Sequence, residues 1–149
     1  KEAFQISLKT DSKNNKSKKM LSFIEQKVIV KSLDRAYEFF DIKDYSSALK
    51  YLNKAVETFP NDPKVYYYRG LTREAVGDFK GAVSDFKDTV KIDRNYVVAY
   101  YKMAESLEKI NKKKEALYMY EKYLGAENID KEFAKKAEQK VIDLGERYY

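Results

Sequence analysis

The chain has 149 residues, with 30 Lys or Arg, 24 Asp or Glu and a formal net charge of +6. It contains no Cys, His or Trp. Their absence excludes a disulfide framework, a thiol nucleophile and a thiolate metal site, and it removes the commonest general base and the commonest zinc ligand. We therefore expect no enzyme, no metal site and no cofactor, although composition alone does not exclude catalysis by other groups.

Hydrophobic residues make up 44% of the chain and include 14 Tyr and 8 Phe, which is too much apolar surface for a disordered tail. The length suits one domain or a short array of repeated units. No uninterrupted apolar run approaches the roughly 18–20 residues that cross a bilayer. We expect a soluble, cytoplasmic chain. A processed, exported chain is the alternative, because the sequence begins at Lys1.

The first predicted segment, residues 1–19, is a basic, flexible arm. Its run 13–19 (KNNKSKK) suggests contact with nucleic acid or an acidic membrane surface. No aromatic residue is interleaved with the run and no nucleic-acid-binding motif appears, so a solvated arm is the favoured interpretation. Phe4, Ile6 and Leu8 alternate with polar residues. A third hypothesis is self-association, in which these three enter the groove of a neighbouring copy.

Residues 20–128 are predicted to be a series of helices, because apolar residues recur at steps of three and four between breaks at 60–63 and 77–78. No breaker occurs from 20 to 42, so the first of these helices is expected to extend towards the N-terminus. Side-chain sizes recur with a period of about 34 residues. The repeated positions are small (Ala36, Gly70, Ala104), small again (Ala48, Ala82, Ala116) and, four residues later, large (Leu52, Phe86, Tyr120).

This period has a simple physical meaning. Two helices of about 14 residues with short turns take up about 34 residues, and neither amphipathic helix buries its apolar face alone. The small positions let paired helices approach closely, and the large side chain fills the space beside them. Stacked helical hairpins, each touching its neighbours, are the expected architecture.

With these residues in place, the region resembles the tetratricopeptide repeat (TPR) family, whose pattern is W-x2-L-G-x2-Y, then A-x3-F and Pro within about 34 residues. The three copies are 29–62, 63–96 and 97–130. The second is the most similar, with Tyr66, Gly70, Phe79, Ala82 and Phe86 at the motif positions. The departures are Arg94 for Pro, Lys112 and Lys113 for an acidic–aromatic pair, and Thr89 and Tyr123 for Ala. The resemblance implies an all-α solenoid that winds as a right-handed superhelix.

Local signals agree with helix starts inside this frame. Asp62 is a candidate cap for a helix that begins with Pro63, and Asp44 and Asp78 are candidate caps for second helices. Asp130 is expected to start a last helix within residues 129–149. Its apolar side chains follow at steps of three and four, and its other positions are polar, so we expect it to cap the C-terminal end of the array.

In TPR proteins the first helix of each repeat lines a concave groove, and the resemblance places a binding site there. The predicted groove is aromatic and aliphatic at its N-terminal end and acidic at its C-terminal end, which suits a peptide or partner helix with an apolar anchor and a basic flank. The alternative is that several of its aromatic residues belong to the core. The candidate residues are Leu33, Tyr37, Phe40, Tyr67, Leu71, Glu74, Tyr101, Lys102, Glu105 and Glu108.

Of these, Tyr67, Leu71 and Tyr101 are the residues we most expect to be exposed in the groove. One TPR subclass binds acidic chaperone C-termini through a clamp of Lys, Asn and Arg. Among the matching positions only Lys102 is cationic, so a chaperone carboxylate-clamp partner is not expected. The other matching positions are Leu33, Tyr37, Tyr68 and Val98.

Arg69 and Arg73 share a helix face, and two interpretations are open. They could form an anion site, but pairing with Asp85 or Asp88 along a helix seam is favoured. The sequence as a whole thus indicates a non-catalytic scaffold or adaptor that binds another protein or peptide. Nucleic-acid binding through the arm and self-association remain as alternatives.

Overall fold

The computed structural model describes residues 14–20, 23, 27, 31 and 33–145. Regular structure in these ranges is helical throughout, and the prediction of an all-α fold is confirmed. Residues 14–20, which overlap the end of the predicted arm, and residues 33–41 are helical. The remaining helices are α2 (Tyr45–Thr58), α3 (Pro63–Ala75), α4 (Phe79–Ile92), α5 (Val98–Lys109), α6 (Lys113–Leu124) and α7 (Lys131–Gly145). Phe4, Ile6 and Leu8 lie outside the described residues.

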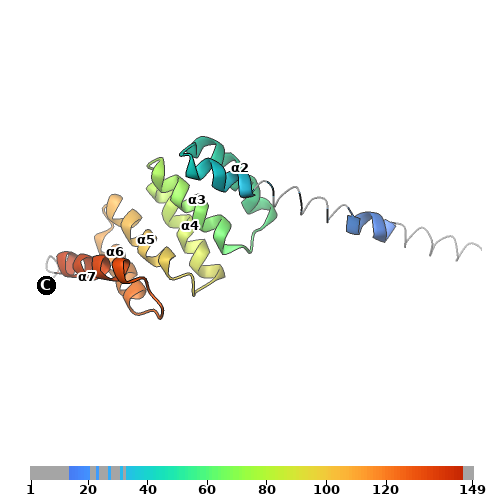
Figure 1. Cartoon of the computed structure of the whole chain (residues 1–149). Helices are drawn as coiled ribbons and strands as arrows, with labels where there is room; N and C mark the ends of the chain where they lie inside the picture. Colours follow the sequence, from blue (N-terminus) through green and yellow to red (C-terminus); the bar gives the residue numbers. More distant parts are fainter. Residues whose placement is uncertain (1–13, 21–22, 24–26, 28–30, 32, 146–149) are drawn as a thin grey trace, which may run out of the picture.

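The helices stack one after another along a single array (Figure 1). From α2 to α7 each helix packs against the next one in the chain, and α3 also contacts α5. The helix 33–41, α3 and α5 are therefore the first helices of three successive hairpins, and α2, α4 and α6 are the second helices. This arrangement confirms the predicted solenoid of helical hairpins.

The turn between the two helices has the same geometry in all three hairpins. Lys43, Gly77 and Asn111 occupy equivalent positions in the three hairpins, and each has a left-handed backbone, with φ of 63°, 83° and 62°. In the middle turn the Gly77 N–H donates to the carbonyl of Glu74, and the next N–H donates to the carbonyl of Arg73. This is the Schellman pattern that ends a helix. The other two turns form the same pair of bonds, so the turn angle is set locally.

Four aspartates start helices, as predicted. Asp44, Asp62 and Asp78 accept hydrogen bonds from backbone N–H groups of α2, α3 and α4 at 3.1, 2.9 and 2.9 Å. Asp130 accepts from two N–H groups at the start of α7. Such caps satisfy backbone donors that have no partner within the helix, and each stabilises its helix by about 1 kcal/mol.

The repeated small and large positions form the core, which confirms the packing expected from the sequence period. Ala48, Ala82 and Ala116 are fully buried, and so are the large side chains Leu52, Phe86 and Tyr120. Gly70 shows why one position must be so small. A Cβ atom there would lie 2.6 Å from the Phe86 ring, closer than carbon atoms can pack.

Helix α7 is the last helix of the array that the structure describes. It packs against α6, where it buries Ala137 and Leu144. The Tyr123 hydroxyl donates to the carbonyl of Asp130 at 3.3 Å and ties the preceding turn to α6. Most of the outward positions of α7 are charged and exposed, as a terminal helix requires.

Candidate functional site

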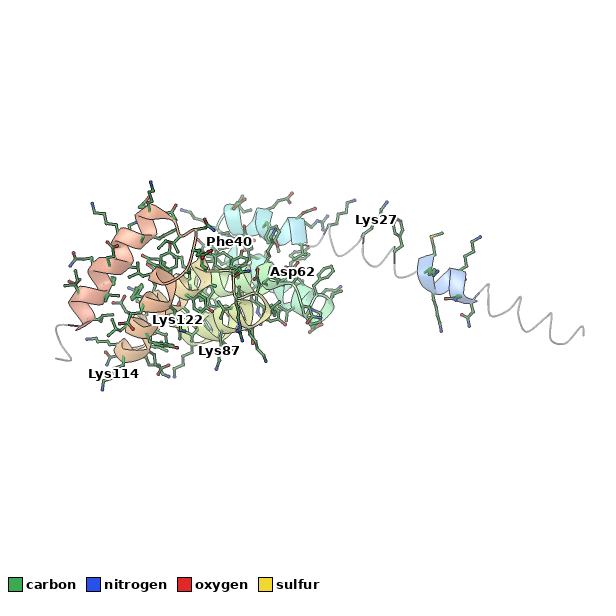
Figure 2. All side chains as sticks on the ribbon, turned by 90° about the horizontal axis from the view of Figure 1, so that it is seen from below. Lys27, Phe40, Asp62, Lys87, Lys114 and Lys122 are labelled. Carbon is green, nitrogen blue, oxygen red and sulfur yellow. The ribbon has the colours of Figure 1, made fainter. Side chains whose placement is uncertain are left out.

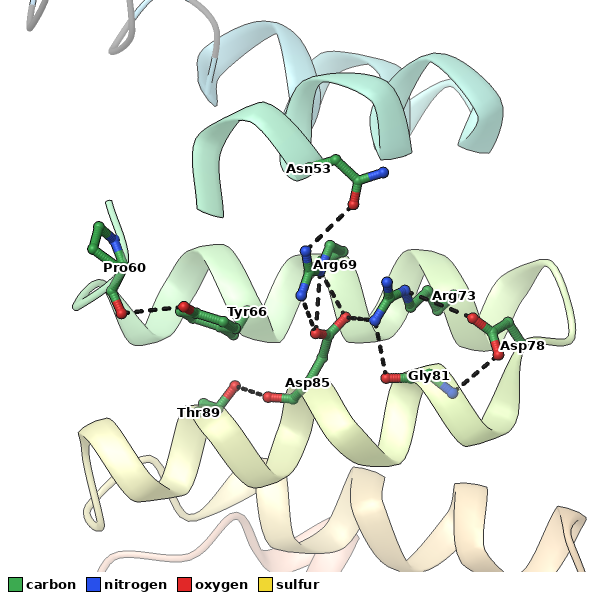
Figure 3. A network of polar contacts seen from close by, with 9 residues as sticks. All are labelled: Asn53, Pro60, Tyr66, Arg69, Arg73, Asp78, Gly81, Asp85 and Thr89. Carbon is green, nitrogen blue, oxygen red and sulfur yellow. Dashed lines mark hydrogen bonds and ion pairs between the residues drawn. The ribbon is translucent and has the colours of Figure 1, made fainter. Parts of the chain in front are cut away.

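A buried ion pair joins the two helices of the middle hairpin (Figure 3). The guanidinium of Arg69 donates from Nε and Nη2 to the carboxylate of Asp85, with the shortest distance at 2.6 Å. Arg73 donates to the same carboxylate at 2.9 Å, and Arg69 also reaches Asn53 of α2. Asp85 is 1% exposed. The favoured interpretation of these arginines, local pairing, is confirmed, and the partner is Asp85 rather than Asp88.

Aromatic residues of the helix 33–41, of α3 and of the turn before α5 form a continuous group, which we call the tyrosine surface: Tyr37, Phe40, Tyr67, Tyr68 and Tyr96. The rings of Tyr37 and Tyr68 have centroids 4.4 Å apart, and those of Tyr67 and Tyr68 are 5.8 Å apart. Tyr96 lies just before α5 and extends the row, 4.9 Å from Tyr67. Phe40 meets the edge of Tyr68 at 6.0 Å. All five side chains are half-buried.

The hydroxyl groups of the four tyrosines in this surface form no hydrogen bond to any residue that the structure describes. In the same part of the chain, no buried side-chain oxygen or nitrogen lacks a partner, so these hydroxyls are open to solvent. The core tyrosines behave differently. Tyr120 and Tyr123 are fully buried and donate to Glu108 and to a backbone carbonyl. The tyrosine surface therefore presents free donors beside apolar rings.

Acidic side chains flank the tyrosine surface. Burial raises the pKa of Tyr37 to about 12, with a further contribution from the negative charges of Asp62 and Asp34. Burial likewise raises the pKa of Tyr96 to about 12, and Asp62 and Asp93 add to it. In the described part of the chain, Asp34, Asp62 and Asp93 pair with no Lys or Arg side chain. The surface is thus an apolar patch with three carboxylates at its border, and the exposed Lys64 lies one turn before Tyr68 on α3. Figure 2 labels Phe40 and Asp62, with lysines of α4 and α6 along the lower edge of that view.

The charged candidates of the predicted groove lie farther along, where α3 meets α5. Glu74 accepts a hydrogen bond from Ser106 at 2.9 Å and lies 3.7 Å from the Lys102 ammonium. Lys102 also pairs with Glu105 at 2.7 Å. Burial raises the pKa of Glu74, and Lys102 and Ser106 oppose that rise. These candidates are therefore brought together, and Lys102 offsets one of the two carboxylate charges.

Glu108 is engaged in the same way by two residues from other helices. It accepts a hydrogen bond from the Tyr120 hydroxyl at 2.6 Å and pairs with Lys140 of α7 at 3.0 Å. This end of the groove thus holds three carboxylates, Glu74, Glu105 and Glu108, against the two lysines Lys102 and Lys140. Lys140 comes from α7, which sequence spacing within the repeats did not reveal.

The expectation that Tyr101 is exposed is wrong. Its side chain is 3% exposed, and its ring packs against Tyr120, Tyr123 and Phe133, with centroids 5.6, 5.5 and 4.8 Å away. Phe133 belongs to α7, so the terminal helix covers this position. Leu33 and Leu71 are half-buried and pack against the two core clusters.

Sequence reasoning did not count three residues of this face among the groove candidates. Tyr68 is one of them: it lies at the centre of the tyrosine surface, and its spacing of three to four residues from Lys64 and Leu71 was the signal that could have shown it. Tyr96 sits outside a helix, where helical spacing gives no information. Lys140 belongs to the cap rather than to a repeat. The geometry of the face thus depends on loops and on α7 as well as on the first helices.

Two further observations concern metal binding and membrane crossing. Among the described residues, acidic side chains do not gather in a group of three that would hold a metal ion. In the same ranges, the helices lack the combination of length and apolar character that crossing a membrane requires.

Two of these hairpins also match models of a known protein family. Two family models described as tetratricopeptide repeat match residues 33–62 and 98–126. These matches fall within the first and third of the three predicted repeats. The chain carries tetratricopeptide repeats. The resemblance proposed from the sequence is therefore confirmed.

Curated relatives share the repeats over part of their length. Human serine/threonine-protein phosphatase 5 is 28% identical over 105 residues, which cover 70% of this chain and 21% of the phosphatase. A small glutamine-rich tetratricopeptide repeat-containing protein of Mycosarcoma maydis is 31% identical over 80 residues, 54% of this chain and 23% of that protein. The chain thus spans about a fifth of the length of these relatives.

Solved TPR structures have the same fold. The first TPR of Spaghetti (RPAP3), bound to the HSP90 peptide SRMEEVD, superposes with a TM-score of 0.71 at 21% identity, covering 78% of this chain and 93% of that one. The TPR2B domain of yeast Sti1 in a complex with Hsp70 gives 0.72 at 20% identity, covering 80% and 97%. The Yersinia enterocolitica secretion chaperone SycD with a YopD peptide gives 0.77 at 14% identity, covering 82% and 95%.

These neighbours correct one expectation. The sequence argued against a chaperone-tail partner because only Lys102 matched the carboxylate clamp. That exclusion conflicts with the neighbours that bind HSP90 and Hsp70 peptides, and it is withdrawn. More generally, the TPR matches indicate a protein-interaction module.

Proposed function

We propose that this TPR chain is a non-catalytic scaffold or adaptor that binds a segment of another protein on the face formed by its first helices, with the tyrosine surface as the main contact. The observation that carries the proposal is the row of half-buried tyrosines whose hydroxyl groups have no partner among the described residues. If these rings belonged to the core, their hydroxyl groups would have hydrogen-bond partners, because buried polar groups are almost always paired.

The chemistry of the residues supports this assignment. Tyrosine offers a large apolar ring and a polar tip while losing little rotamer freedom, so it is enriched among the residues that dominate binding energy. Tyr37, Tyr67 and Tyr68 come from two different first helices, so a bound segment would cross the hairpins. Tyr101, by contrast, contributes little accessible area and is left out of the proposed contact.

The similar structures supply candidate partners. Peptides are bound by the Spaghetti, Sti1 and SycD domains, and peptide binding is the property we carry over to this chain. A chaperone tail such as SRMEEVD is therefore one probe for the experiment below. Phosphatase activity is not carried over, because only 21% of phosphatase 5 is matched.

A peptide library tests the proposal even though the natural partner is unidentified. Random peptides displayed on phage would be selected against the full chain, and each selected peptide would be titrated while backbone chemical shifts are followed by NMR. We expect the shift changes to centre on the helix 33–41, α3 and Tyr96. Changes confined to α4 and α6, or no selected peptide at all, would refute the proposal.

The two alternatives from the sequence remain predictions. Lys16, Lys18 and Lys19 are exposed on the helical stretch 14–20, whereas Lys13 and the residues proposed for self-association lie outside the described residues. Binding of nucleic acid that disappears on deletion of residues 1–19 would support the first alternative, and a concentration-dependent dimer in light scattering would support the second.

A further inference from the structure

We propose that the tyrosine surface takes a proline-rich segment in the polyproline II conformation, with a Lys or Arg beside the prolines. This inference rests on the proposed function and specifies the chemical class of the partner. Three features of the surface favour such a segment over a helix: the spacing of its rings, its free hydroxyl groups and the carboxylates at its border.

The rings form a path rather than a single pocket. Along Tyr37, Tyr68, Tyr67 and Tyr96 the centroids are separated by 4.4, 5.8 and 4.9 Å. A polyproline II helix has three residues per turn and rises about 9 Å per turn, so prolines three residues apart would face the surface and meet alternate rings of this path. Aromatic-lined grooves are the surfaces that recognise this conformation, and its stiffness lowers the entropy lost on binding.

The free tyrosine hydroxyl groups favour a partner whose backbone carbonyl groups are unpaired. A polyproline II segment makes no internal hydrogen bonds, so its carbonyl groups are free to accept from tyrosine hydroxyls. Proline also has no N–H, so the partner brings fewer donors that need acceptors. In a bound α-helix the carbonyls already accept from the helix itself. The four hydroxyls of the tyrosine surface would then gain no backbone acceptor.

Charge selects the residue beside the prolines. Asp34 lies one turn before Tyr37 on the helix 33–41, and Asp62 caps α3, which carries Tyr67 and Tyr68. The Tyr96 N–H donates to the Asp93 carbonyl at 3.1 Å. The charge of Asp62 acts on both Tyr37 and Tyr96. In the described ranges these carboxylates have no cationic partner. A Lys or Arg in the segment would supply the missing charge and fix the direction of binding, since opposite charges steer and orient partners.

The test measures, by fluorescence anisotropy, how tightly the full chain binds each of three labelled synthetic peptides of equal length. The first is proline-rich with one arginine, the second has glutamate in place of that arginine, and the third is an alanine-rich amphipathic helix that keeps the arginine. We expect the first to bind roughly tenfold more tightly than the third, and about threefold more tightly than the second. The Asp62→Asn variant should reduce the preference for arginine over glutamate, whereas Asp88→Asn on α4 should leave it unchanged.

Equal or tighter binding of the helical peptide, or an equal affinity for the arginine and glutamate peptides, would overturn the inference. The library experiment separates this failure from failure of the proposed function. If selected peptides bind the tyrosine surface but contain no proline, or if SRMEEVD binds there and the proline-rich peptide does not, the proposed function stands and the inference falls. If no peptide binds that surface, both fall.

Discussion

Lys140 is related to Glu108 as Ser106 is related to Glu74. In each pair the later residue donates a hydrogen bond to a glutamate 32 positions earlier, at 3.0 and 2.9 Å. Because Glu74 and Glu108 occupy the same position in successive repeats, α7 stands where the first helix of a further repeat would stand. The terminal helix therefore continues the first-helix face as well as closing the core.

Replacement of Glu108 tests this link between the cap and the array. The Glu108→Ala variant leaves the fully buried Tyr120 hydroxyl without its acceptor, so we expect the free energy of unfolding in urea to fall by about 1–3 kcal/mol. Adding Tyr120→Phe should cost less than the sum of the single changes, because the two groups interact. The control is Glu115→Ala, which breaks only the exposed pair with Lys112. An equal effect of Glu108→Ala and Glu115→Ala would contradict the assignment.

The Asp85 carboxylate is predicted to be the most sensitive polar group of the middle hairpin. Asp85→Asn leaves the guanidinium groups of Arg69 and Arg73 facing a neutral amide in a buried site. Removing one partner of a buried ion pair lowers the free energy of unfolding by about 3–5 kcal/mol. Unfolding in urea would measure this loss without changing the ionic strength. Asp88→Asn on the same helix should change stability by about 0.5 kcal/mol or less. Similar losses in the two variants would show that the network contributes little.

Close packing at Gly70 gives a prediction with a matched control. Gly70→Ala places a methyl group against the fully buried Phe86 ring, and we expect a loss of about 1–3 kcal/mol in unfolding free energy. Gly145→Ala, at a position with no atom within 4 Å of an added Cβ, should be neutral or slightly stabilising. Partial recovery of stability by Phe86→Leu in the Gly70→Ala background would identify the clash as the cause. Equal stability of the two alanine variants would contradict this account.

The tyrosine surface should make stability fall at alkaline pH. The pKa values of Tyr37 and Tyr96 rise from 10.0 to about 12 on folding, so between these values the folded chain holds protons that the unfolded chain has lost. Stability is then fully present below pH 10 and declines as pH rises through about 12. Urea unfolding across this range should show a smaller decline in the Tyr37→Phe and Tyr96→Phe double variant. An unchanged pH dependence in that variant would rule out this explanation.

The repeat architecture was predictable from the sequence because it depends on local rules. Positions such as Ala48 and Leu52 recur in each repeat, and helix geometry alone places them on one face. The aspartate caps follow from residue type and position in the same way. Neither inference requires knowledge of contacts between distant segments.

The details of the candidate site were harder to predict because they depend on such contacts. Tyr101 was expected to be exposed, but Phe133 of the terminal helix covers it. Tyr96 reaches the tyrosine surface from a loop whose path no periodicity describes. Lys140 neutralises Glu108 only because α7 takes the position of a first helix. Spacing within a helix shows which residues share a face, whereas packing between hairpins decides which of them remain accessible.

The most direct test of the account is the affinity of one library-selected peptide for two tyrosine variants. Tyr68→Ala removes the ring at the centre of the tyrosine surface, and Tyr118→Ala removes an exposed ring of α6, 52% accessible, outside it. With helix content checked by circular dichroism, the account predicts binding roughly tenfold weaker for Tyr68→Ala and unchanged for Tyr118→Ala. Unchanged binding by a folded Tyr68→Ala variant, or an equal loss with Tyr118→Ala, would contradict the claim that the tyrosine surface is the binding site.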